Sequence, residues 1–199
     1  MKFLTFAVAF FIVCQTAFVS ASEISPPEKK LQTSVNIILS VLDNETLSIH
    51  QKEERIVEII DGLFDLSLMG KLCLGRQNWS RFSSEEKADY ITLFDQFLKD
   101  FYTDKIELFN NEKVVFNPGE MEKNKITVPT HLMSNGEKIS MHYKMYQSHN
   151  VWKVYDVEIE GVSIIKTYRS QFNQILEDGP PKDLLNKLKE KKIKGATYN

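Results

Sequence analysis

The stretch VYDVEIEGVSIIKTYRSQF, residues 154–172, changes its hydrophobic period in the middle. Up to Glu160 its residues alternate as in a β-strand, and after Gly161 aliphatic residues open a helical pattern. Glycine adopts the left-handed backbone conformation that a sharp turn requires. The stretch therefore predicts a strand that turns directly into a helix, and it raises the question of what the aliphatic junction covers.

Helical patterns fill the first half of the chain, and a shorter pair of helices follows the junction. Ser83 and Glu86 form a capping box at the start of the third helix. The predicted helices span about 26–42, 50–74, 83–109, 162–177 and 182–193.

Strand patterns lie between these helices. In KITVPTHLMSNGEKISMHYKMY, residues 125–146, Asn135-Gly136 predicts a two-residue hairpin turn. This turn pairs Ile126 with Met145, Val128 with Tyr143, Thr130 with Met141 and Leu132 with Ile139. One face of the sheet is then apolar and the other polar. We predict an α+β fold with helices packed on one face of a twisted antiparallel sheet, as in NTF2-like or cystatin-like domains.

The chain of 199 residues, 42% hydrophobic and 26% charged, has the composition of one globular domain. Lys2 precedes the apolar run FLTFAVAFFIVC, and FVSAS ends this segment with small residues. We predict a signal peptide at 1–21, cleaved after Ala21, and a single domain at 22–199. An uncleaved membrane anchor is the alternative.

Charge and cysteine content restrict the function of the exported domain. Without residues 1–21 it has 24 basic and 27 acidic residues, which argues against a general nucleic-acid-binding protein. Cys73 is its single cysteine, so we predict no disulfide and a buried structural thiol. The basic C-terminal segment 182–199 fits either a solvated tail or a contact with an acidic partner or anionic membrane.

No catalytic motif is found, and we predict neither a catalytic residue nor a metal site. Three histidines and three alternating carboxylates are the candidates for such chemistry, but we predict that all six are solvated: His131, His142, His149, Asp156, Glu158 and Glu160. The 13 Phe, 7 Tyr and 6 Met fit either a plain core or the lining of a ligand pocket.

Three segments together resemble a known family. LFDLSLMGKLCLGRQNW, FSSEEKADYITLFDQFL and WKVYDVEIEGVSIIKTYRSQF, in this order, resemble the MlaC, or toluene-tolerance, family of periplasmic phospholipid-binding proteins. The resemblance covers about residues 50–179 and is most specific at Trp152, Tyr155-Asp156, Gly161-Val162-Ser163, Tyr168-Arg169 and Phe172. Two departures are Ser84, where the family often has proline, and one extra residue between Gly75 and Trp79.

The resemblance implies a soluble, non-enzymatic periplasmic carrier whose fold encloses an apolar cavity. It would shuttle glycerophospholipid between an outer-membrane lipoprotein–porin complex and the inner-membrane Mla ABC transporter, which maintains the lipid asymmetry of the outer membrane. The implied protein is a monomer that uses no cofactor or metal, binds no nucleic acid and holds phospholipid as cargo.

On this basis we expect acyl chains between the sheet and the helices. Val162, Ile164 and Ile165 would cover this space, and Arg169 would either meet a phosphate or form a structural salt bridge. The expected lipid-binding residues are Phe64, Leu68, Met69, Leu72, Phe94, Leu98, Phe101, Tyr102, Val128, Met141, Tyr143, Met145, Val162, Ile164, Ile165 and Arg169.

Three alternatives stay open. The first is an exported α+β module with a solid core that binds a protein partner. The second is a carrier of another lipid, such as a hopanoid. The third is an enzyme with its pocket in the same place, which would need polar groups that converge inside the pocket.

Overall fold

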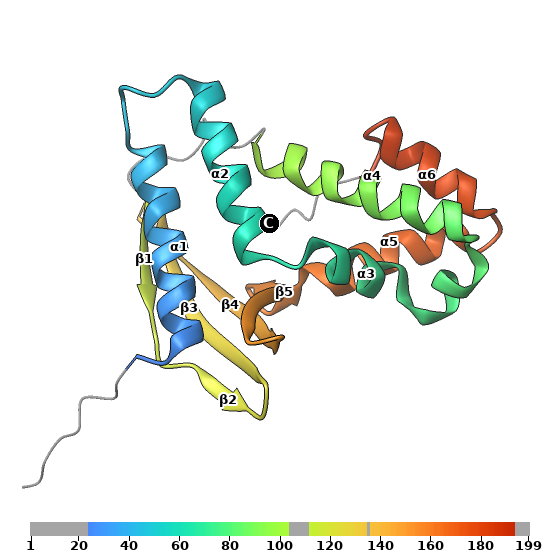
Figure 1. Ribbon diagram of the computed structural model, residues 1–199. Coiled ribbons are helices and arrows are strands. Elements are labelled where there is room, and N and C mark those ends of the chain that lie inside the picture. Colours follow the sequence, from blue (N-terminus) through green and yellow to red (C-terminus); the bar gives the residue numbers. More distant parts are fainter. Residues whose placement is uncertain (1–23, 104–111, 135, 194–199) are drawn as a thin grey trace, which may run out of the picture.

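The computed structural model describes residues 24–103, 112–134 and 136–193 (Figure 1). The helices of this part of the chain are α1 (Pro26–Leu42), α2 (Ile49–Leu63), α3 (Leu66–Arg81), α4 (Ser84–Thr103), α5 (Ile164–Leu176) and α6 (Pro181–Lys189). Its strands are β1 (Lys113–Phe116), β2 (Glu120–Glu122), β3 (Lys125–Ser134), β4 (Glu137–Ser148), β5 (Val151–Ile159) and β6 (Val162–Ser163). The predicted α+β class is confirmed.

The strands form one antiparallel sheet in the order β1-β3-β4-β5-β6, and β2 pairs with the other end of β3. Figure 1 shows α1 in front of this sheet with α2 beside it, while α3 to α6 form a helical group beyond β5. The four predicted β3–β4 pairs are confirmed, including Ile126 with Met145 and Leu132 with Ile139. Asn135 lies outside the described residues, but Ser134 pairs with Glu137 on either side of the predicted turn.

The single helix predicted at 50–74 is wrong, because the chain breaks between α2 and α3. Phe64 leaves the helix to bridge Val154 of β5, and the Asp65 N–H donates to the Val154 carbonyl at 2.9 Å. The Asp65 Oδ1 then accepts from the Leu68 N–H at 2.8 Å and caps α3. Asp65 interrupts the predicted apolar pattern because it is the N-cap residue at which a new helix, α3, begins.

Helix boundaries near the chain end also differ from the prediction. The helix expected from 162 begins at Ile164, because Val162 and Ser163 form β6 and the Ser163 Oγ caps α5 through the Lys166 N–H at 3.1 Å. The helix expected to reach 193 ends at Lys189. The capping box of α4 is confirmed by reciprocal Ser83–Glu86 bonds, and the predicted extension to 109 lies outside the described residues.

The junction between β5 and α5 turns within two residues. Glu160 and Gly161 have φ of 49° and 78°, so both central residues of the Ile159–Val162 hairpin are left-handed. The predicted role of Gly161 is thus consistent with the backbone. The turn brings the first residues of α5 back beside the strand that precedes it.

Asp156 joins the strand to the helix, and its predicted solvated position is wrong. The side chain is 5% exposed, and its carboxylate accepts from the Ser163 Oγ at 2.8 and 3.0 Å and from the Ile165 N–H at 3.2 Å. Lys144 of β4 lies 3.5 Å from the same carboxylate. The negative charge is also favourable at the N-terminus of α5. Three partner residues and the N-terminus of α5 therefore compensate for its burial.

Aromatic side chains form the core of the helical group. The rings of Tyr90 and Phe94 on α4 stack at 5.9 Å, as do those of Tyr168 and Phe172 on α5. The two pairs meet edge to face, and all four side chains are at most 1% exposed. The Tyr90 hydroxyl donates to the Gly70 carbonyl of α3 at 2.9 Å. Much of the aromatic surplus is thus used for helix packing.

We predict that Asp156→Ala lowers the free energy of unfolding by about 3 kcal/mol, because buried donors of Ser163 and Ile165 lose their acceptor. Urea denaturation monitored by circular dichroism measures the change. The exposed carboxylate Glu120 supplies the control, since Glu120→Ala should change stability by less than about 0.5 kcal/mol. Equal effects of the two substitutions would contradict the assigned role of Asp156.

Candidate functional site

The apolar face of the sheet is unevenly covered. At one end, Ile126, Met145 and Val154 are 3%, 0% and 0% exposed. Toward the β3–β4 turn, Leu132 and Ile139 face each other and are only half-buried. Coverage by other elements therefore decreases along the hairpin.

The half-buried end of this face, called the hairpin-end face below, draws on four neighbouring strands. The registers place its members on one side of the sheet: Val114, Phe116, Leu132, Ile139, Met141, Tyr143 and Ile159. No member carries a charge. Burial raises the pKa of Tyr143 to about 12, so its hydroxyl stays neutral. A contiguous apolar surface of this kind fits an apolar ligand better than an ionic one.

The four sheet residues expected to bind lipid share this apolar side. Met141 and Tyr143 belong to the hairpin-end face, whereas Val128 and Met145 are 1% and 0% exposed in the packed part. The structure therefore separates the four into two half-buried residues and two fully packed ones.

The expected helical residues lie mostly in packed positions. Met69, Phe94 and Leu98 are at most 1% exposed, and Phe64, Leu68 and Leu72 are half-buried at the α2–α3 corner and along α3. The side chains of Phe101 and Tyr102 lie outside the described residues.

The three aliphatic residues expected to cover the lipid, Val162, Ile164 and Ile165, differ in their burial. Ile164 and Ile165 are 4% and 5% exposed, but Val162 is 47% exposed, because the tight turn directs it to the outside of the hairpin. Within the described part of the chain Arg169 forms no salt bridge, and its expected contact with a phosphate stays a prediction. Its Nε donates to the Leu72 carbonyl at 2.8 Å, and its Nη2 contacts the same oxygen, so it connects α5 to α3.

Five residues of the hairpin-end face were missing from the sequence-based set: Val114, Phe116, Leu132, Ile139 and Ile159. The strand β1 is too short to show a clear alternation, so its pairing with β3 could not be anticipated. Leu132 and Ile139 could have been included from the sequence, because the predicted hairpin register already placed them opposite each other on the apolar face.

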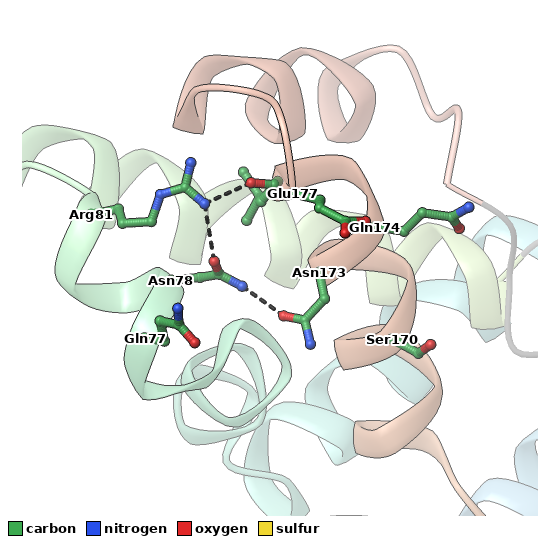
Figure 2. Close-up of a pocket in the computed structure, with 8 residues that line it drawn as sticks. Gln77, Asn78, Arg81, Ser170, Asn173, Gln174 and Glu177 are labelled. Carbon is green, nitrogen blue, oxygen red and sulfur yellow. Dashed lines mark hydrogen bonds between the residues drawn. The ribbon is translucent and has the colours of Figure 1, made fainter.

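A polar hollow of about 510 Å³ lies between α3 and α5 (Figure 2). Asn78 donates to the Asn173 Oδ1 at 2.7 Å across it. Arg81 donates through Nη1 to the Leu176 carbonyl at 2.6 Å and through Nη2 to the Gly179 carbonyl at 2.7 Å. These bonds satisfy the last carbonyl of α5 and one carbonyl of the segment between α5 and α6, so the hollow lies at a structural joint between the helices.

A second hollow of about 390 Å³ lies along α3 and is lined by Lys71, Leu72, Gly75, Arg76, Trp79 and Arg169. Neither hollow borders the sheet, so neither is the apolar cavity expected between the sheet and the helices. The described residues hold no group of three metal-ligating side chains. None of the described helices has the length and hydropathy of a membrane span.

We predict that Arg81→Ala lowers the free energy of unfolding by about 2 kcal/mol, because the carbonyls of Leu176 and Gly179 lose a charged donor. Arg81→Lys should recover only part of this, since an ammonium lacks the planar fork that reaches both oxygens. Arg55 is exposed on α2, and Arg55→Ala is the control, expected to change stability by less than about 0.5 kcal/mol in chemical denaturation. Full stability of Arg81→Lys would show that charge alone suffices.

Comparisons with known proteins agree with this architecture. The fold is similar to that of a phospholipid-binding protein from Ralstonia solanacearum in complex with a phospholipid, with a TM-score of 0.74 and 24% sequence identity. The match covers 83% of this chain and 96% of that one, and at this identity it establishes the fold. The MlaC protein family matches residues 32–190. Since this match spans most of the sequence, the chain belongs to the MlaC family.

Proposed function

We propose that this protein is an exported, non-enzymatic carrier of phospholipid that holds acyl chains against the hairpin-end face. The observation that carries the proposal is the contiguous, uncharged and incompletely covered surface on one side of the sheet. Membership of the MlaC family supports it. The related Ralstonia protein, which has the same fold, is a phospholipid-binding protein.

Enclosure of the acyl chains is the energetic task of such a carrier. Exposing one CH₂ group to water costs about 0.8 kcal/mol, so roughly 30 methylenes cost on the order of 20 kcal/mol. An apolar surface that replaces the membrane around these chains removes most of this cost. The hairpin-end face supplies such a surface from side chains that are already partly exposed.

Loading would begin at the hairpin end of the apolar face, where coverage by other elements is incomplete. The opposite end of the apolar face is fully packed around Met145 and Val154, which are 0% exposed. The half-buried contacts near Leu132 and Ile139 have less apolar area to lose when the layers move apart. We infer that the packed end remains closed while lipid enters beside the β3–β4 turn.

The cellular route of the lipid is the finer part of the proposal. We propose that residues 1–21 direct export to the periplasm, where a monomer carries phospholipid between an outer-membrane lipoprotein–porin complex and an inner-membrane Mla ABC transporter. This transport would maintain outer-membrane lipid asymmetry. Family membership supports the route. The carrier needs no cofactor, because no bond in the cargo is made or broken.

We predict that Val114→Glu lowers the lipid-loaded fraction at least about tenfold, since a carboxylate against acyl chains costs more than about 1.4 kcal/mol. Native mass spectrometry with solvent extraction, on protein purified from its exported compartment, measures this fraction and identifies the lipid. Its neighbour Val115 is 50% exposed on the other face of β1, so Val115→Glu should retain normal loading.

Circular dichroism must show that both variants fold. A wild-type protein without extractable lipid, or equal loading of the two folded variants, would contradict the proposed carrier or its surface. A stoichiometric hopanoid instead of phospholipid would identify a different cargo. A lipid-free protein that retains a specific protein partner would favour the interaction module.

A further inference from the structure

The second hollow, called the Trp79 hollow below, owes its shape to an interruption in α3. Gly75 has φ of 73° and ψ of 161°, which is outside the helical range and in a region that glycine tolerates. The helix changes course at this residue and leaves a hollow of about 390 Å³ whose walls include Leu72 and the Trp79 indole. Arg169 of α5 lies beside Gly75. The hollow is therefore a built feature of the backbone.

Positive charge is concentrated at this hollow. Lys71, Arg76 and Arg169 line it, and no carboxylate side chain does. Within the described part of the chain, none of these three cations forms an ion pair. This contrasts with the excess of acidic residues in the whole sequence, 27 against 25 basic residues. Several uncompensated cations around one concave surface attract an anion.

Trp79 holds two ammonium groups near the hollow. Lys71 and Lys87 place their Nζ atoms 5.7 and 5.6 Å from the centre of the indole, within the range of cation–π attraction. The indole is itself fixed edge to face against Tyr90 at 6.5 Å. Its half-buried ring therefore offers an apolar wall next to cations that are already positioned.

We propose that the Trp79 hollow binds the phosphate of an organic phosphate ester. The phosphate would meet Lys71, Arg76 and the N–H groups of Arg169 not used on the Leu72 carbonyl, while the organic part lies against Trp79. Phosphate is favoured over a single carboxylate because it offers more charge and more acceptor oxygens to this many donors. The site shares no residue with the hairpin-end face and does not depend on the carrier function.

The fluorescence of Trp79 gives a direct readout. The sequence has two tryptophans, so Trp152→Phe leaves Trp79 as the single indole. In this background we expect a saturable fluorescence change with glycerol 3-phosphate or with vesicles of phosphatidylglycerol in phosphatidylcholine. The apparent affinity should fall as salt increases, because the contact is ionic.

Matched variants assign the response to the hollow. Lys71→Gln with Arg76→Gln should weaken the apparent affinity at least tenfold. Lys182 and Lys189 are exposed on α6, outside the hollow, and Lys182→Gln with Lys189→Gln should leave the affinity within twofold of the parent. Both double variants should keep normal lipid loading in native mass spectrometry, which separates this test from that of the carrier.

The probes distinguish the source of the phosphate. A response to vesicles alone supports a lipid headgroup, and a response to glycerol 3-phosphate as well supports a free phosphate ester. No saturable response to either probe, or an equal response of the two double variants, would overturn the proposal. So would a response confined to polyglutamate, which would indicate an acidic protein partner instead.

Discussion

The contacts of the buried Asp156 carboxylate determine how α5 is joined to the sheet, and the rest of the arrangement depends on them. The carboxylate accepts from Ser163 and Ile165 while Lys144 balances its charge, so one side chain joins β4, β5, β6 and α5. These contacts explain the aliphatic residues that follow Gly161. Ile164 and Ile165 form the apolar first turn of a helix, α5, that Asp156 fixes to the sheet. Since α5 contributes Tyr168 and Phe172 to the aromatic core, the position of the helical group relative to the sheet follows from the same contacts.

Uneven packing of the sheet is what gives this fold a capacity to hold an apolar ligand. A face that was covered along its whole length would form a solid core, and a face that was exposed along its length would aggregate. Here the packed end around Met145 retains the fold, while the end near the β3–β4 turn keeps partly exposed apolar side chains. The two demands on the same sheet, stability and access, are therefore met at different positions along the strands.

The aromatic content was ambiguous as evidence for a ligand pocket. Phe94, expected to contact lipid, is 0% exposed and packs against Tyr90, Tyr168 and Phe172. Rings at helical spacing bury well between helices, and no local pattern distinguishes this use from the lining of a cavity. The incompletely covered surface is built mostly from aliphatic residues of the sheet, together with the rings of Phe116 and Tyr143.

The sequence by itself determined the elements whose signals are local. Hydrophobic period, the Ser83 capping box, the Asn135-Gly136 turn and Gly161 fixed the α+β class, the β3–β4 register and the sharp junction, because each depends on neighbouring residues. The tertiary structure alone decided burial. Asp156 is covered because α5 returns over it, and β1 joins the apolar face through pairing with distant β3. Val162 is exposed although its neighbours are buried, since contacts between remote segments determine which side of a turn faces solvent.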